Sequence, residues 1–177
     1  MTIAVVDVAY RGRGAHAACA VIDAWDGNSP LFTRTAAVST VLPYAPGRFY
    51  VRELPCLLAV LEALPQLPPT VVVDAYVVLP GGRPGLGAHL HDALGALGAR
   101  AAVVGIAKSA FAGALSCPFI VPVTRGASGN PLFVTAVGMA PDDAARHVHA
   151  MAGRHRIPDI VRIIDRLARE RAPAAAA

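Results

Sequence analysis

The most constraining feature of this sequence is a short apolar run that ends on a carboxylate, Val-Val-Val-Asp at residues 71–74. Runs of β-branched residues of this length are typical of buried strands. A second run near the N-terminus, residues 3–7, follows the same pattern and ends on Asp7. Because a buried carboxylate is costly unless it is paired or ligates a metal ion, the two runs predict a site where the acids meet. We expect Asp7, Glu53 and Asp74 to hold divalent cations there.

The composition is that of a chain rich in small apolar residues. Of its 177 residues, 55% are hydrophobic and only 16% are charged, and the mean hydropathy is +0.50. This length is enough for one domain with a sizeable core. No stretch reaches the roughly 18 uninterrupted apolar residues of a membrane span, and the first residues lack the basic start of a signal peptide. We therefore expect a protein without a membrane segment.

Cysteine usage and net charge limit the compartment and the partners. Cys19, Cys56 and Cys117 are far apart and odd in number, and their spacing fits no metal-ligand motif. We expect reduced thiols in a cytoplasmic protein. The formal net charge is +4 and the isoelectric point is near 9.3. This mild basic excess is compatible with nucleic-acid binding.

The first forty residues have the alternation and the turn signals of an antiparallel meander. Apolar strand patterns cover residues 3–10, 17–25 and 31–41. Two segments rich in turn-forming residues, 11–14 and 26–30, separate them. We expect three strands that pair in order through short turns.

A stiff loop ends the meander. Its two prolines, Pro43 and Pro46, each fix a φ angle and restrict the preceding residue. The loop is therefore either a plain connection from strand to helix or a rigid prong that presents Tyr44.

Leucines at helical spacing predict a helix within residues 48–64. Because a proline is best tolerated in the first turn of a helix, Pro55 places the start of this helix near Arg52 and Glu53. Glu53 is then either a site residue or an acid favoured by the helix dipole.

The second half of the chain alternates strands with helices. The strand that carries Asp74 follows a helix, so we expect it to lie parallel to the first strand, with Asp7 and Asp74 at one edge of the sheet. Lys108 directly follows an apolar strand and is either a site residue or a solvated surface lysine. The predicted elements are strands at 70–78 and 101–107, a helix at 86–97, a hairpin of 118–124 with 131–137, and helices at 141–153 and 158–171. Residues 1–171 are expected to form a single domain and the Ala/Pro tail 172–177 to be disordered.

The predicted order is three antiparallel strands, helix, strand, helix, strand and an α/β extension. This is the order of the ribonuclease H-like fold, an α/β fold with a mixed central sheet and flanking helices. That fold also keeps metal ligands on its first strand, first helix and fourth strand, which are the places of Asp7, Glu53 and Asp74. Element order and acid placement together predict this fold.

A set of short strings runs in order along residues 3–170. The strings are VDVAY at 6–10, PYAPG at 43–47, RELP at 52–55, VD at 73–74, GLGAH at 85–89, VGIAKS at 104–109, PLF at 131–133 and RIPD at 156–159, followed by Arg162 and Asp165. In this order and spacing they resemble the endonuclease V family, whose members nick nucleic acid near deaminated adenine.

The resemblance implies roles for particular residues. The metal-binding carboxylates of the family match Asp7, Glu53 and Asp74, and a lysine near its active centre matches Lys108. A wedge that pries strands apart beside the flipped-out base matches Pro43, Tyr44, Ala45 and Pro46. The base pocket corresponds to Ala75, Tyr76, Gly85 and His89.

The resemblance also implies an activity, a cofactor and a partner. We predict a metal-dependent endonuclease that cleaves a phosphodiester near inosine in nucleic-acid repair and acts as a monomer. The cofactor is Mg²⁺ or Mn²⁺, because such hard cations prefer carboxylate oxygens, neutralise a phosphodiester and lower the pKa of a bound water. The partner is DNA containing inosine, with RNA left open, since a mispaired inosine costs least to extrude.

The sequence departs from the family pattern at several places. A Gly-His-Gly motif is replaced by residues 75–77 (Ala-Tyr-Val), a His-Pro-Arg segment by residues 80–82, and a metal-side histidine by Gly138. These changes leave two alternatives: a nucleic-acid-binding protein of the same fold with lost or altered cleavage, and a related nuclease with another target. Binding to inosine-containing duplex without a metal-dependent product would favour the first, and a substrate panel would reveal the second.

Overall fold

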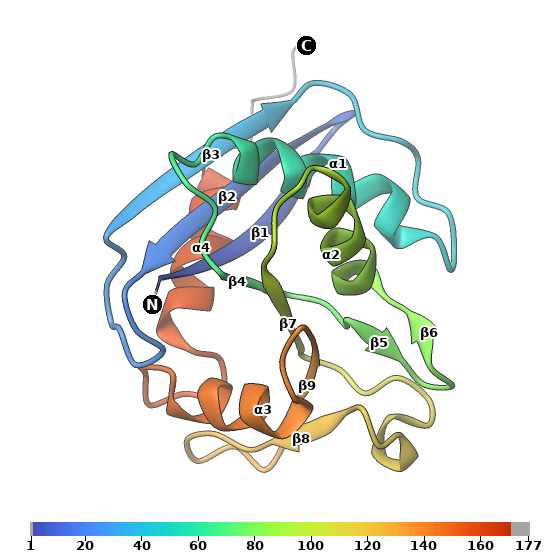
Figure 1. The fold of residues 1–177 in the computed structure, drawn as a ribbon, viewed down its shortest axis with the longest axis vertical. Helices are drawn as coiled ribbons and strands as arrows, with labels where there is room; N and C mark the ends of the chain where they lie inside the picture. Colours follow the sequence, from blue (N-terminus) through green and yellow to red (C-terminus); the bar gives the residue numbers. More distant parts are fainter. Residues whose placement is uncertain (1, 171–177) are drawn as a thin grey trace.

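The computed structural model describes residues 2–170 and has a mixed α/β architecture (Figure 1). Within this range, one seven-stranded sheet has the order β3-β2-β1-β4-β7-β9-β8. Its strands are β1 (Ile3–Arg11), β2 (Gly14–Ile22), β3 (Phe32–Val38), β4 (Thr70–Val73), β7 (Ala102–Ala107), β8 (Val121–Val123) and β9 (Leu132–Val137). The helices are α1 (Phe49–Glu62), α2 (Leu86–Ala96), the 3₁₀ turn η1 (Ala114–Ser116), α3 (Pro141–Ala150) and α4 (Asp159–Glu170). The predicted helix end at residue 171 and the predicted tail 172–177 lie outside the described residues.

The first three strands form the predicted meander. β1 pairs antiparallel with β2, and β2 pairs antiparallel with β3. Gly12, in the tight turn between β1 and β2, adopts φ +59°, which a glycine reaches without strain. The prediction that the second strand extends to residue 25 is wrong. β2 ends at Ile22, and Trp25 instead stacks on His147 of α3, with the ring centroids 4.7 Å apart.

The later strands extend the sheet in the parallel sense and then reverse. β4 lies parallel to both β1 and β7, as expected for strands joined through helices. β9 pairs antiparallel with β7 and with β8, which confirms the late hairpin. Three antiparallel strands, two further parallel strands and flanking helices confirm the predicted ribonuclease H-like fold.

Helices cover both faces of the sheet (Figure 1). Successive residues of β1 point to opposite faces: Ile3 and Val5 pack with α3 and α4, whereas Ala4 and Val6 pack with α1 and α2. Because neither face meets water, β4 is buried along its whole length. This explains why its sequence is a continuous run of valines rather than an alternating pattern.

The strand that precedes Asp74 is shorter than predicted. β4 ends at Val73, and residues 74–77 leave the sheet instead of continuing the strand to residue 78. The backbone finds another partner there, because the Val77 N–H donates to Thr135 Oγ1 at 2.8 Å. A separate small hairpin follows, formed by β5 (Val78–Leu79) and β6 (Arg83–Pro84). Asp74 is therefore the first residue beyond the strand, at the edge of the sheet.

The helix that carries Glu53 begins earlier than predicted. α1 starts at Phe49, so Pro55 lies inside the helix and not in its first turn. A proline there removes one backbone hydrogen bond. The helix tolerates the loss because it buries an apolar face against the sheet, formed by Cys56, Leu57, Val60 and Leu61. The first turn of α1 holds no acid, so the interpretation of Glu53 as a helix-terminal acid is wrong.

Two further expectations concern the chain as a whole. None of the helices within residues 2–170 is long and apolar enough to cross a membrane. The three cysteines, Cys19, Cys56 and Cys117, are buried free thiols, in agreement with the expectation of reduced cysteines.

Candidate active site

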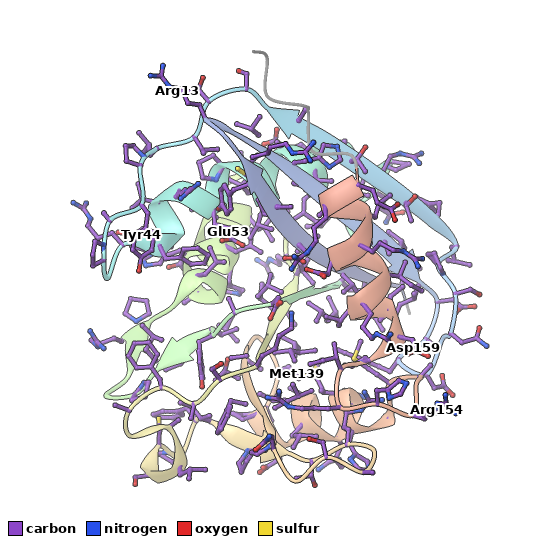
Figure 2. All side chains as sticks on the ribbon, turned by 180° about the vertical axis from the view of Figure 1, so that it is seen from behind. Arg13, Tyr44, Glu53, Met139, Arg154 and Asp159 are labelled. Atoms are coloured by element: carbon purple, nitrogen blue, oxygen red, sulfur yellow. The ribbon has the colours of Figure 1, made fainter. Side chains whose placement is uncertain are left out.

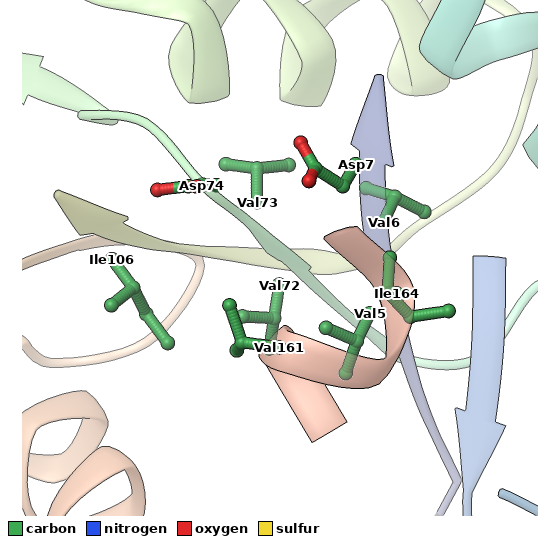
Figure 3. Close-up of a pocket in the computed structure, with 9 residues that line it drawn as sticks. All are labelled: Val5, Val6, Asp7, Val72, Val73, Asp74, Ile106, Val161 and Ile164. Carbon is green, nitrogen blue, oxygen red and sulfur yellow. The ribbon is translucent and has the colours of Figure 1, made fainter. Parts of the chain in front are cut away.

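Two carboxylates, Asp7 and Asp74, lie at the edge of the sheet where the parallel pairing of β1 with β4 ends. β1 and β4 are parallel neighbours with Val6 opposite Val73, so Asp7 and Asp74 each follow a paired position. Figure 3 shows both carboxyl groups above an apolar floor, with Asp7 within β1, directly after its pairing with β4, and Asp74 just beyond the end of β4. The hollow beneath them measures only about 10 Å³. Asp7 Oδ1 also accepts a hydrogen bond from the Val8 N–H at 2.8 Å. The valine runs of the sequence thus correctly predict the meeting of these two acids.

Glu53 joins this pair from α1. Its side chain is buried, and the charges of Asp7 and Asp74 act on it through space. The Tyr10 hydroxyl donates to Glu53 Oε2 at 3.2 Å. The guanidinium of Arg52 lies 3.8 Å from the centre of the Tyr10 ring, a cation–π contact. Tyr10 is thus held between a cation on its face and the acid at its hydroxyl.

Burial and mutual repulsion raise the pKa values of two of these acids. Desolvation, and after it the charge of Asp74, raises the pKa of Asp7 to about 7. Burial, and after it the charge of Asp7, raises the pKa of Glu53 to about 8, against the opposing effect of the Tyr10 hydrogen bond. Each acid is therefore costly to ionise in its place, and a nearby positive charge would remove that cost.

Lys108 brings positive charge to the same edge. It directly follows β7, the neighbour of β4, and its Nζ pairs with Asp74 Oδ2. Arg156 fixes the backbone beneath it, because its Nη2 donates to the carbonyls of Lys108 and Pro131. The structure therefore places Lys108 with the carboxylates and not among the solvated surface lysines.

A fourth carboxylate lies near the group, and sequence reasoning assigned no role to it. α4 packs beside β1, and the charge of Asp165 contributes to the raised pKa of Asp7, after the larger effects of burial and Asp74. Arg169 donates from Nε and Nη2 to Asp165 Oδ1 at 3.0 and 2.8 Å. The signal in the sequence is its place beside the buried stripe of α4, which comprises Ile160, Ile164 and Ala168.

Gly138, where the resemblance suggested a missing metal-side histidine, lies far from the carboxylates. It follows β9, which runs antiparallel to β7, so it lies at the opposite edge of the sheet beside Ala102. The interpretation that Gly138 deletes a group from the metal side is therefore wrong. The side chain that the later part of the chain brings to Asp7 is Asp165.

An aromatic-walled hollow of about 330 Å³ opens beside Asp74. This is within the range of pockets that bind small ligands, about 300–1,000 Å³. Of the residues predicted from the resemblance, Tyr44, Ala75, Tyr76 and Gly85 line it. The rest of the wall includes Phe49, Tyr50 and Phe111.

The other predicted residues lie next to this hollow. Pro43, Ala45 and Pro46 belong to the exposed loop that presents Tyr44, whose side chain is 61% exposed. His89 is not among the lining residues. It stacks on Tyr50, a residue of the wall, with the ring centroids 3.6 Å apart. His89 therefore contacts the wall of the hollow without lining it.

Tyr76 organises one wall of the hollow. Its hydroxyl donates to the Ser109 carbonyl at 2.8 Å and accepts from the Phe111 N–H at 3.3 Å. Its ring meets that of Phe111 edge-on, with centroids 6.2 Å apart. The residue therefore ties the segment after Lys108 to the rim of the hollow. Its neighbour Ala75 requires a glycine in β7, since a Cβ on Gly105 would lie 2.3 Å from the Ala75 carbonyl oxygen.

The donor set at the edge of the sheet fits a hard divalent cation. Asp7, Glu53, Asp74 and Asp165 offer carboxylate oxygens, which Mg²⁺ and Mn²⁺ prefer, and not the thiolates and imidazoles typical of zinc sites. Within residues 2–170, no three His, Cys, Asp or Glu side chains already adopt a ligating arrangement. In this arrangement Lys108 holds Asp74 and Tyr10 holds Glu53. A cation would compete with Lys108 for Asp74, and it would offset the repulsion that raises the two pKa values.

Comparison with known proteins identifies a family for this chain. The family model described as Endonuclease V matches residues 1–166. An endonuclease V of Streptomyces avermitilis is 33% identical over 184 residues, which cover 93% of this chain and 77% of that protein. An endonuclease V of Xanthomonas axonopodis is 32% identical over 192 residues, covering 96% of this chain and 77% of that protein.

Solved structures show the same fold. The crystal structure of the Streptomyces avermitilis endonuclease V superposes with a TM-score of 0.74 at 31% identity, covering 96% of this chain and 80% of that one. A variant of Ciona intestinalis endonuclease V, in complex with a 23mer DNA that contains an inosine, superposes with a TM-score of 0.76. That pair covers 96% of this chain and 84% of the other, and at 17% identity it shows the fold alone. Since the family model spans nearly the whole chain and relatives exceed 30% identity, the chain belongs to the endonuclease V family.

Proposed function

We propose that this chain is a metal-dependent endonuclease that hydrolyses a phosphodiester near inosine in DNA, with Mg²⁺ or Mn²⁺ as cofactor. The observation that carries the proposal is the convergence of Asp7, Glu53 and Asp74 at one edge of the sheet. Relatives named endonuclease V support the reaction class, and the complex of the Ciona protein with inosine-containing DNA supports the substrate. RNA that contains inosine is the second substrate to test.

The carboxylates and Lys108 have different roles in this proposal. Asp7, Glu53 and Asp74 would hold the cation, with Asp165 close enough to assist. When bound, such a cation neutralises a phosphodiester and lowers the pKa of a water molecule. Lys108, whose Nζ lies against Asp74, presents a positive charge that orients the anionic phosphate at the same edge.

We assign the aromatic-walled hollow beside Asp74 to the extruded base. Ala75, Tyr76 and Gly85 line it, and Tyr44 reaches it from the exposed loop of Pro43 to Pro46. Extrusion costs a few kcal/mol, and stacking on an aromatic ring returns roughly 1–3 kcal/mol per base. Tyr44 is therefore the residue we assign to the wedge that fills or opens the stack. His89 supports the wall through Tyr50.

The direct test is cleavage of a labelled duplex that contains a single deoxyinosine, with Mg²⁺ or Mn²⁺. We expect the wild-type protein to nick the strand near the inosine and the Asp74→Asn variant to give no product. Asp92→Asn is the matched control, because Asp92 lies on α2 with 80% of its side chain exposed and carries the same substitution away from the site. It should cleave like the wild type.

Two results would redirect the proposal. Full activity of the Asp74→Asn variant would refute the assignment of the site. A folded wild-type protein that binds the duplex and yields no product with either metal would instead establish the nucleic-acid-binding alternative. A panel of duplexes with other damaged or mismatched bases, and of inosine-containing RNA, would then identify any other target.

We further propose that the enzyme acts as a monomer in the cytoplasm. The site draws its residues from β1, from α1 and from the positions directly after β4 and β7 of one chain, so no second copy is needed to complete it. The buried free thiols are those of a reducing compartment. Light scattering over a hundredfold range of protein concentration tests the first statement, and a constant monomer mass is the expected result.

A further inference from the structure

A second hollow, of about 470 Å³, lies around the loop between α3 and α4. Its polar lining comprises Ser128, Arg154, His155, Arg156 and Arg162, and it is called the basic basin below. Figure 2 shows Arg154 on this loop, close to Asp159 at the start of α4. Asp159 Oδ1 lies 3.6 Å from Arg162 Nη1, and Asp159 is the acidic residue of this segment. Three guanidinium groups and one imidazole therefore line the basin, and one of these guanidinium groups, that of Arg162, pairs with Asp159.

A buried arginine, Arg125, fixes the backbone of the α3–α4 segment that carries the basic basin. Arg125 is 5% exposed and donates hydrogen bonds only to backbone carbonyls of the α3–α4 segment. These carbonyls belong to His149, Met151, Gly153, His155 and Arg156. The loop is thus held in its shape before any ligand binds, and the charge of Arg125 adds to the positive potential. Preorganisation of this kind lowers the entropy cost of binding.

One donor at the wall of the basic basin lacks a partner. Arg156 uses Nη2 for the carbonyls of Lys108 and Pro131. Its Nε is buried and has no hydrogen-bond partner in the described part of the chain. Buried polar groups are nearly always paired, so an unpaired donor calls for an acceptor. An anion in the basin would provide one.

The basic basin and the catalytic carboxylates lie at the same edge of the sheet. β9 runs antiparallel to β7 with Phe133 opposite Ala107, so the loop before β9, which carries Ser128, meets the end of β7. Arg156 joins the two regions directly, because it binds the backbone of Lys108, whose side chain binds Asp74. Arg156 thus contributes to the basin and contacts the residue that pairs with Asp74, so the basin adjoins the carboxylate site.

We propose that the basic basin binds backbone phosphates of the nucleic-acid substrate on one flank of the scissile bond. This inference rests on the proposed function. Guanidinium groups match phosphate oxygens in geometry and charge. Contacts to phosphates position a nucleic acid without reading its sequence. The basin therefore supplies affinity and register, whereas the aromatic-walled hollow selects the base.

The test measures binding without cleavage. In the Asp74→Asn background, fluorescence anisotropy of a labelled inosine-containing duplex is followed over a series of salt concentrations. The slope of log K against log salt should decrease by about 0.9 for each phosphate that an Arg154→Ala/Arg162→Ala variant no longer neutralises. The matched control is Arg100→Ala, an exposed arginine that precedes β7 at the opposite edge of the sheet. This control should leave the slope unchanged.

Two further arms identify the ligand. Duplexes shortened on one side of the inosine should abolish the difference between parent and double variant for one flank only. Equal slopes for the double variant and Arg100→Ala would overturn the proposal. So would a difference in slope between parent and double variant that persists whichever side of the inosine is shortened. So would thermal protection by inorganic phosphate that the double variant loses without a change in its DNA slope, because the basin would then serve free phosphate. Absence of cleavage by the wild type would refute the proposed function and leave this binding test intact.

Discussion

Burial makes the charges of Asp7 and Glu53 unfavourable in the folded state. Their pKa values of about 7 and about 8 lie above those of the unfolded chain, about 3.9 and 4.3. Between these limits the folded state binds more protons than the unfolded state, so the free energy of unfolding decreases as the pH rises. The contribution is fully present below about pH 4 and is lost as the pH passes the folded values.

The first prediction follows from this sign. In metal-free buffer, the free energy of unfolding of the wild-type protein should decrease between about pH 5 and pH 9, as measured by urea denaturation. Asp7→Asn should reduce this decrease, since each unit of pKa shift that is removed corresponds to about 1.4 kcal/mol. Asp92→Asn, on an exposed carboxylate, should follow the wild type. A wild-type stability that rises over this range would contradict the burial of the two acids.

Tyr10 is the residue whose hydroxyl sets the position of Glu53. It donates to Glu53 Oε2 and is itself fixed by Arg52 on its ring. Tyr10→Phe keeps the ring and removes the donor, so the metal concentration for half-maximal cleavage should rise, with a stability loss of about 1 kcal/mol. In a Glu53→Gln background the same change should cost less, which a double-mutant cycle of unfolding free energies measures. Unchanged metal dependence would show that Tyr10 does not position Glu53.

At the scale of elements, the α3–α4 segment fixes the position of the backbone at the end of β7. Arg125 holds the segment from inside, and Arg156 extends from it to the carbonyls of Lys108 and Pro131. Neither contact follows from sequence periodicity, because both join side chains to backbone carbonyls that are distant along the chain. The position of Lys108 therefore depends on an element that lies almost fifty residues further along.

The prediction at this scale concerns Arg156→Lys. A lysine keeps the charge but cannot donate to both carbonyls in the same geometry. Because small misplacements of catalytic groups cost up to about a hundredfold in rate, we expect a decrease in kcat of about tenfold or more. The salt dependence of DNA binding should stay unchanged, since the charge is retained. Arg146→Lys on α3, where Arg146 pairs with Asp143 at the surface, is the matched control. Equal kcat values for the two variants would refute the role of Arg156 in positioning Lys108.

Over the whole molecule, the sequence predicted what depends on local pattern. The valine run of β4 and the run that ends on Asp7 each predicted a buried strand, and their parallel pairing placed both acids at one edge. Patterns did not predict where a chain leaves a strand for a distant partner, as Val77 does for Thr135. They also did not predict a proline tolerated inside α1, because burial of the apolar face decides that balance. The sequence assigned no site role to Asp165, because its closeness to Asp7 depends on how α4 packs beside β1.

The last prediction follows from the separate origins of the carboxylates. They lie on β1, on α1, directly after β4 and on α4, so a bound cation would tie both helical layers to the sheet. A ligand at 100 times its Kd that binds only the folded state adds about 2.7 kcal/mol. Mg²⁺ or Mn²⁺ should therefore raise the unfolding midpoint, and more at pH 8.5 than at pH 6, because Asp7 and Glu53 bind a cation only when ionised.

Thermal unfolding in matched metal and chelator buffers measures this shift. The Asp74→Asn variant should lose most of it, whereas Asp92→Asn should keep it in full. Equal shifts for both variants would mean that the cation binds elsewhere, and the assignment of the carboxylate edge would fail. A shift confined to the wild type and the control would show that the cation binds at Asp74, and that binding there stabilises the whole fold.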